Sequence, residues 1–218
     1  MMRSPHASAI PEVVTQLARL IWQPGRYMHA RWWQVLDMSA WQSAYRQRPA
    51  TRASIDRQLI ARRGWPDSTS ALGAALTPSN AACAVLHLVP NLRRVALAHG
   101  VRAMGCPDYL LVGHYRRALA PWLDARQCDR LLLTRRDWPT PSVLPPEQLV
   151  DAALATTGAW LDEMQVSASP DIAAAHRAMR VLLPPGDSFT RSGQVPVSDA
   201  WARLAALEKM LCMSSTTR

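Results

Sequence analysis

The chain is poor in several residue types that usually mark chemical function. It has one phenylalanine, and Lys209 is its only lysine. Its four cysteines (Cys83, Cys106, Cys128 and Cys212) are far apart and form no C-x-x-C pair, which argues against a zinc knuckle and a redox dithiol. We expect free, buried thiols. No G-x-x-x-x-G-K and no G-x-G-x-x-G occurs, so no nucleotide or other cofactor is indicated.

Long hydrophobic runs are also missing. Apolar runs such as Leu131–Leu133 are far short of the roughly 20 residues that span a membrane. The first residues, MMRSPHASAIPEVV, carry prolines and a glutamate where a signal peptide would be continuously apolar. Hydrophobic residues nevertheless make up 49% of the chain, enough for a sizeable core. We therefore expect a cytoplasmic protein without direct membrane insertion.

The basic charge is unevenly distributed. The formal net charge is +9, and residues 1–140 contain 19 arginines against 8 acids, a net of +11. Residues 141–218 contain 6 basic residues against 8 acids, a net of −2. The first two thirds of the chain would therefore favour an acidic partner surface.

Hydrophobic periodicity is helical nearly throughout. A first helix ends at Pro24-Gly25, a second covers about 28–46, and a third ends at Gly64. The further predicted helices start at the capping pair Thr77-Pro78, restart after a kink at Pro90, and start again at Cys106-Pro107-Asp108, at Pro121, at 147, at Ser169-Pro170 and at Ser198. In the segment opened by Cys106, we expect Val112, Tyr115 and Leu119 to point inward.

The predicted fold class is therefore all-α, with about eight or nine short helices packed around one core. We expect a single domain over 8–213, with flexible termini at 1–7 and 214–218. The proline-dense segment 135–147 coincides with the change in charge. It is the candidate place for a bend between sub-lobes 8–134 and 147–213.

Candidate catalytic and metal sites are weak. Ser188 of the GDS triplet has no histidine after it, the last being His176, and it lies in a loop rich in proline, glycine and serine, so neither a matched base nor a rigid turn supports a nucleophilic role. Cys83 and His87 share a helix face, but further ligands would have to come from Cys106 or His114.

The carboxylates give no acid/base pair either. The adjacent residues Asp162 and Glu163 do not face one another on a helix. We expect no catalytic residues, no metal site and no enzymatic activity.

Four arginine doublets are the candidate binding residues: Arg62-Arg63, Arg93-Arg94, Arg116-Arg117 and Arg135-Arg136. They could contact an acidic protein partner, and the last three pairs are the preferred candidates. They could also contact nucleic acid, which makes an arginine-rich helical nucleic-acid-binding protein the alternative function. Their spread over different helices is more typical of a solvated face than of one groove-reading helix.

The stretch Trp22–Trp33, WQPGRYMHARWW, holds four aromatic residues, a Pro-Gly break and a histidine. It could form an aromatic cage for a ligand. The simpler interpretation is a structural corner, in which tryptophans close one helix and open the next.

Four short motifs in a fixed order resemble the SctK family (YscK and its relatives) of bacterial type III secretion. They are P-x-x-Y-x-H at Pro24, Tyr27 and His29, L-x-H-G ending at His99-Gly100, G-x-W-L-x-x-M from Gly158 to Met164, and R-x-L-L-P from Arg180 to Pro184. The resemblance extends from about residue 20 to 185.

This resemblance implies a cytoplasmic, mostly helical, non-catalytic adaptor of the sorting platform beneath the inner-membrane ring. One side would contact the forkhead-associated-like cytoplasmic domain of the ring protein SctD. The other would contact the pod protein SctQ, which leads through SctL to the secretion ATPase. The resemblance assigns no individual binding residue in this sequence.

Overall fold

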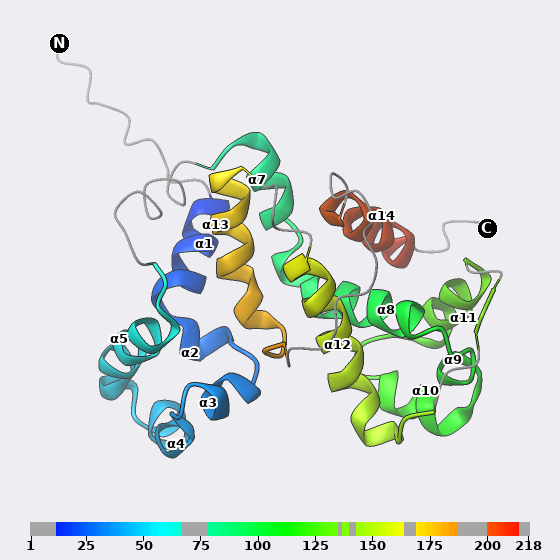
Figure 1. Ribbon diagram of the computed structural model, residues 1–218, viewed down its shortest axis with the longest axis horizontal. Coiled ribbons are helices and arrows are strands. Elements are labelled where there is room, and N and C mark those ends of the chain that lie inside the picture. The colour runs from blue at the N-terminus through cyan, green and yellow to red at the C-terminus, as the bar shows by residue number, and fades with distance from the viewer. Residues whose placement is uncertain are drawn as a thin grey trace, which may run out of the picture.

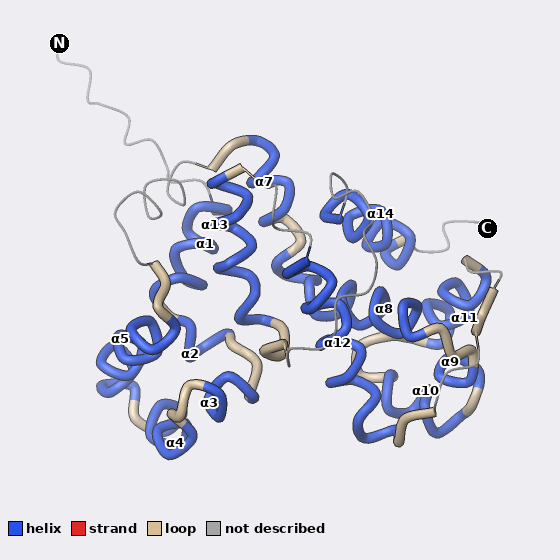
Figure 2. Tube along the Cα trace, viewed as in Figure 1, coloured by secondary structure: helices blue, strands red, loops and turns tan. Residues whose placement is uncertain are grey.

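The computed structural model describes residues 12–66, 78–134, 137–139, 143–163, 169–186 and 200–213. Across these residues all regular structure is helical, which confirms the all-α class (Figure 2). The helices are α1 (Glu12–Trp22), α2 (Pro24–Tyr27), α3 (Arg31–Val35), α4 (Ser39–Gln47), α5 (Arg52–Arg63), α7 (Asn80–Leu86), α8 (Leu92–Met104), α9 (Asp108–Leu111), α10 (Gly113–Leu119), α11 (Ala125–Leu133), α12 (Pro146–Glu163), α13 (Pro170–Met179) and α14 (Ala200–Cys212), with 3₁₀ turns η1 (Pro49–Thr51), η2 (Val89–Asn91) and η4 (Arg180–Leu182).

The crossing of α8 and α12 is the centre of the fold and its most extensive helix contact (Figure 1). Gly100 of α8 faces the main chain of Ala153, and no side chain would fit between them. Beside it, the Thr157 hydroxyl donates to the Ala96 carbonyl oxygen at 2.6 Å. One small residue and one buried hydroxyl thus let two backbones approach closely.

The ends of the molecule are built from shorter helices. The α1–α5 segment lies at one end of the long axis and α9–α11 at the other, with α13 and α7 packed between α1 and α8 (Figure 1). One hydrophobic cluster nevertheless includes buried residues from both sides of segment 135–147. Within that segment, the Leu144 backbone is bonded to the Tyr109 and Tyr115 hydroxyls at 2.9 and 2.7 Å. The single domain, its sub-lobes and the bend remain predictions.

The predicted second helix, 28–46, is wrong as one helix. It is divided into α3 and α4 because Asp37 adopts a positive φ of 53°, which aspartate tolerates better than most residues. Pro24-Gly25 also does more than end α1, since Pro24 is the first residue of the short helix α2. This part of the chain therefore forms more and shorter helices than its hydrophobic periodicity predicts.

Two other predicted helices need correction. The segment opened by Cys106-Pro107-Asp108 is divided at Val112, whose backbone is extended and whose side chain is 37% exposed, so it does not point inward. Tyr115 and Leu119 are buried as expected. Pro121 lies before α11, which begins at Ala125 with a capping box between Asp124 and Gln127.

Several predicted boundaries are confirmed. Pro90 lies in the 3₁₀ turn η2 that separates α7 from α8, and Gly64 ends α5 in the left-handed conformation. The predicted helix start at Thr77-Pro78 is wrong by two residues, because Pro78 precedes α7 and the N-cap is Ser79, whose hydroxyl accepts from the Ala82 amide. The predicted caps Thr77 and Ser198 lie outside the described residues.

The stretch Asn80–Met104, which contains α7, η2 and α8, is long and apolar enough by composition to cross a membrane. The sequence did not indicate this stretch, because polar and charged residues interrupt its apolar residues. Half of its most apolar window is buried within the protein, where it packs on α12, α13 and α14. Packing in the core accounts for its apolar character.

Arginine side chains join the short helices. Each helix end leaves backbone carbonyls without intrahelical partners, and guanidinium groups with five N–H donors can satisfy them from a distance. We call the set of arginines that donate to such groups the carbonyl-binding arginines: Arg52 to Tyr45 and Arg46, Arg62 to Leu36 and Asp37, Arg63 to Arg177, Arg93 to Tyr27 and Leu182, Arg130 to Met210, and Arg180 to Pro184.

Candidate functional site

The stretch Trp22–Trp33 forms a corner between α1, α3 and η4. Trp33 is buried and meets the Tyr45 ring edge to face, with the centroids 5.4 Å apart. Trp32 donates from Nε1 to the Leu183 carbonyl at 2.8 Å, and the His29 amide donates to the Val181 carbonyl at 2.7 Å. These contacts support the interpretation as a structural corner.

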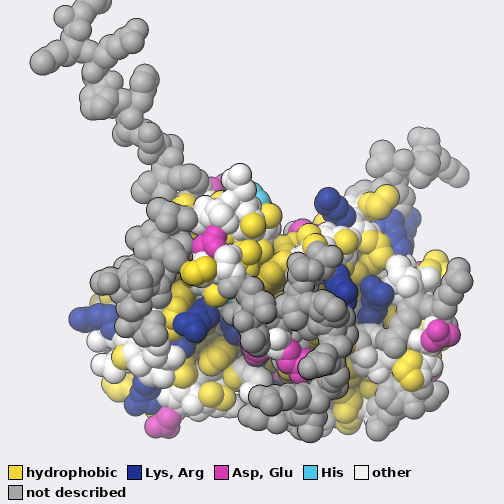
Figure 3. Space-filling view, turned by 45° about the horizontal axis from the view of Figure 1, so that its top comes forward, with side chains coloured by type: hydrophobic (Ala, Val, Ile, Leu, Met, Phe, Trp, Pro, Cys, Tyr) yellow, Lys and Arg dark blue, Asp and Glu magenta, His cyan; other side chains and the backbone are white. Residues whose placement is uncertain are grey.

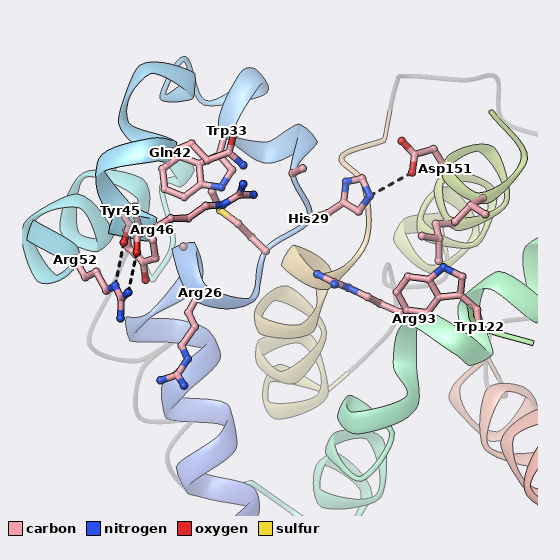
Figure 4. A pocket seen from close by; sticks show the side chains of 15 residues that line it. Arg26, His29, Trp33, Gln42, Tyr45, Arg46, Arg52, Arg93, Trp122 and Asp151 are labelled. Carbon is pink, nitrogen blue, oxygen red and sulfur yellow. Dashed lines mark hydrogen bonds and ion pairs between the residues drawn. The ribbon is translucent and has the colours of Figure 1, made fainter. Parts of the chain in front are cut away.

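The same stretch also lines a cleft of about 630 Å³ between α2–α4 and the α8–α12 core (Figure 4). Its charged lining consists of four arginines (Arg26, Arg46, Arg52 and Arg93), with His29 and the single carboxylate Asp151. Met28, Val150 and Leu154 contribute apolar surface. We call it the basic cleft, and it is the candidate binding site.

Arg93 is fixed in the wall of the basic cleft. Its Nε donates to Leu182 at 3.0 Å and its Nη2 to Tyr27 at 2.7 Å. Burial lowers the pKa of Arg93, but it remains far above neutral pH because arginine starts so high. The side chain is therefore a pre-oriented cation, and Figure 4 shows it directed toward the open space of the cleft.

Opposite Arg93, a buried carboxylate supports the wall. Asp56 is 4% exposed and accepts from the Gly25 amide at 3.0 Å and from the Tyr45 hydroxyl at 3.1 Å. Burial raises the pKa of Asp56, opposed by these hydrogen bonds and by Arg52. Burial, followed by Asp56, raises the pKa of Tyr45. The Asp56 carboxylate and the Tyr45 hydroxyl thus connect α2, α4 and α5 through hydrogen bonds.

His29 and Asp151 lie across the mouth of the basic cleft, with Nε2 and Oδ1 3.4 Å apart. Burial lowers the pKa of His29, Asp151 raises it, and Arg93 and Arg31 lower it further. The lowered pKa favours the neutral form of the His29 imidazole. The guanidinium groups are therefore the dominant charges of the site.

The three arginine doublets that lie within the described residues are on three different helices, α5, α8 and α10. Arg94 donates to Cys212 Sγ at 3.1 Å. Arg116 contacts Asp129 and donates to the Ala125 carbonyl at 2.9 Å, and Arg117 is exposed on α10. Arg135 and Arg136 lie outside the described residues. Figure 3 likewise shows basic side chains scattered over the visible face.

The weaker catalytic and metal candidates gain no support. Ser188 lies outside the described residues. Cys83 is half-buried beside the Pro78 carbonyl, and His87 is exposed. Cys106 is buried and His114 is exposed. In the described ranges no group of three His, Cys, Asp or Glu side chains could hold a metal ion.

Sequence reasoning missed a second polar cluster. Arg180, 8% exposed, donates from Nε to both oxygens of Asp162 at 3.0 and 2.9 Å and from Nη1 to the Pro184 carbonyl. The buried His176 lies 3.1 Å from Asp162. A Cβ at Gly158 would lie 2.9–3.1 Å from the Arg180 guanidinium. The sequence signal was present in Gly158 and Arg180, since both belong to the quoted motifs.

The motifs behind the family resemblance serve packing in this structure. Pro24 is buried at the corner, and Gly100 lies at the α8–α12 crossing. His99 stacks on Trp160 with ring centroids 4.2 Å apart. Its Nδ1 lies 3.1 Å from the Thr157 hydroxyl. Arg180 holds the α12–α13 junction. The described motif residues thus fix how the helices pack against one another.

The comparisons with known proteins place the chain in type III secretion. A family model described as "Type III secretion system subunit" matches residues 15–185. Neither a curated protein nor a solved structure gives a significant match. The matched region runs from α1 through η4 and contains all four motifs. The chain therefore belongs to this family of type III secretion system subunits.

Proposed function

We propose that this subunit is a SctK-like, non-enzymatic adaptor of the cytoplasmic sorting platform. It would join the forkhead-associated-like domain of SctD to the pod protein SctQ, and through SctQ and SctL to the secretion ATPase. It would work at the cytoplasmic face of the inner membrane. The family match supplies the secretion context, and the motif order resembling SctK supplies the particular member.

The distribution of exposed apolar side chains carries the adaptor role. Val35 and Trp41 are 60% and 54% exposed on α3 and α4. Leu111 and Leu133 are 54% and 82% exposed on α9 and α11. These two sets lie at opposite ends of the long axis (Figure 1). Because exposed aromatic and large apolar residues often anchor interfaces, two separated sets suit two different neighbours.

Co-purification with the SctD cytoplasmic domain and with SctQ tests the proposal. We expect Trp41→Ala to weaken binding of one partner and Leu111→Ala to weaken binding of the other, each by about tenfold or more. Met213→Ala, another exposed apolar residue at 68% exposure, serves as the matched control. Retention of neither partner by the unaltered protein would contradict the adaptor role.

The nucleic-acid alternative makes a different prediction. It requires tight retention on DNA that falls steeply with added salt. The adaptor proposal expects weak retention, since the carbonyl-binding arginines direct donors at the protein itself. Tight DNA binding without binding of SctD or SctQ would favour the alternative.

A further inference from the structure

We propose that the basic cleft binds an acidic peptide segment of a partner protein, with Arg46 and Arg93 as the principal carboxylate-binding residues. The inference rests on the proposed function only in taking the partner to be a protein. It adds what that function does not specify: a defined site and the chemistry of the segment that enters it.

The charge of the basic cleft is the first argument. Four guanidinium groups line a space with one carboxylate among its lining residues, and that carboxylate, Asp151, is shared with His29. Like charges gathered in a concave, partly dehydrated space repel one another and raise the local positive potential. An anionic ligand would relieve this repulsion.

The geometry of the two principal arginines is the second argument. Arg93 is held by two backbone acceptors, which still leaves N–H donors for a ligand. Arg46, near the end of α4, is exposed. Its side chain is drawn beside Trp33, across the open space from Arg93 (Figure 4). One fixed cation and one adjustable cation on opposite walls suit consecutive carboxylates on a chain.

The apolar lining favours a peptide over nucleic acid. Met28, Val150 and Leu154 lie among the arginines, and Val150, the one of the three that is only half-buried, would contact an aliphatic side chain between two acidic ones. Trp33 is only 3% exposed and is packed against Tyr45, so it presents no free face for base stacking, and the half-buried Trp122 is the one other tryptophan in the lining. The volume of about 630 Å³ also suits a short segment, being in the range of small-ligand clefts.

Fluorescence anisotropy with a short labelled peptide, rich in glutamate with one central leucine, tests the site on the full chain. We expect Arg46→Glu to weaken binding about tenfold or more, because it removes one charge-assisted contact and adds repulsion. Arg48→Glu, the same change two residues later and outside the lining, is expected to change binding less than about twofold. Asp151→Asn is expected to tighten binding. Thermal unfolding of each variant checks that the fold is retained.

Equal losses in Arg46→Glu and Arg48→Glu would overturn the inference, since they would indicate general attraction to a basic protein. It would also be overturned if a single-stranded oligonucleotide bound more tightly than the peptide and depended as strongly on Arg46. The measurement uses neither SctD nor SctQ. Failed co-purification with intact peptide binding would therefore contradict the proposed function and leave the site standing.

Discussion

The α-carbon of Gly100 faces the carbonyl oxygen of Ala153 so closely that a Cβ at position 100 would lie 1.9 Å from that oxygen. The obstructing atoms are backbone, so no side-chain rotation can relieve the overlap. The crossing of α8 and α12 can form only if residue 100 has no side chain.

Gly100→Ala is therefore expected to destabilise the protein by about 3 kcal/mol or more, because two core helices must separate. Urea unfolding followed by far-UV circular dichroism measures the loss. Gly113→Ala is the control, since the nearest atom to a Cβ there is the end of the Arg117 side chain at 3.9 Å. A similar loss in both variants would contradict close helix approach as the cause.

Arg180→Met is expected to destabilise the protein by about 1–3 kcal/mol, because it leaves the Asp162 carboxylate and the Pro184 carbonyl short of a donor. Arg180→Lys is expected to recover little, since an ammonium lacks the planar fork that reaches both groups. Arg177→Met, an exposed change three residues earlier, is the matched control for urea unfolding. Full recovery by lysine would show that charge alone matters.

His99 is expected to make the protein sensitive to acid. Burial first, then Arg102 and Arg203, lowers the pKa of His99 to about 4. An unfolded histidine takes up its proton near pH 6.5. Stability is therefore unaffected by this group above about pH 6.5 and falls as the pH drops toward 4, by ~3 kcal/mol at most.

His99→Gln should remove that part of the pH dependence, because glutamine does not titrate and can still donate to Thr157. Urea unfolding at a series of pH values from 7 down to about 4 gives the slope. His114→Gln, at an exposed position, should leave the slope unchanged. Identical slopes in His99→Gln and the unaltered protein would rule out His99 as the source.

Arg117→Glu is expected to weaken binding of the SctD cytoplasmic domain or of SctQ without lowering the melting temperature, because its side chain is exposed. Arg93→Glu is expected to lower the melting temperature as well, since it removes the donors to Tyr27 and Leu182. Pull-down with thermal unfolding separates the two effects. If partner binding is unchanged in Arg117→Glu, and also in the charge-reversal variants Arg94→Glu and Arg116→Glu, these arginines make no electrostatic contribution to the partner interface.

The sequence predicted the fold class because apolar residues recur with helical spacing along most of the chain. Side-chain N-caps contribute at Ser79 of α7 and at Asp124 of α11. Pro90 and Gly64 mark helix ends that the sequence predicts, because proline lacks a backbone N–H and glycine readily adopts the left-handed conformation. The break at Asp37 was not predictable in this way, since it depends on a positive φ that aspartate merely tolerates. The break at Val112 comes directly before Gly113, and glycine in a helix interior is about 1 kcal/mol less favourable than alanine.

The basic cleft was harder to predict because its walls come from distant parts of the chain. Arg46 and Arg93 were visible as residues, but only the fold brings them to opposite sides of one space. Arg93 was selected as part of a doublet, whereas Arg94 lies at the α8–α14 contact instead. Adjacent positions on a helix point in different directions. Two neighbouring arginines therefore do not predict one shared binding site.

The carbonyl-binding arginines have a practical consequence for isolating this protein. A guanidinium–carbonyl contact joins a cation to a neutral group at short range, so dissolved ions weaken it far less than they weaken attraction between separated surface charges. Concentrated salt should therefore strip charge-dependent neighbours from the subunit while its short helices stay assembled.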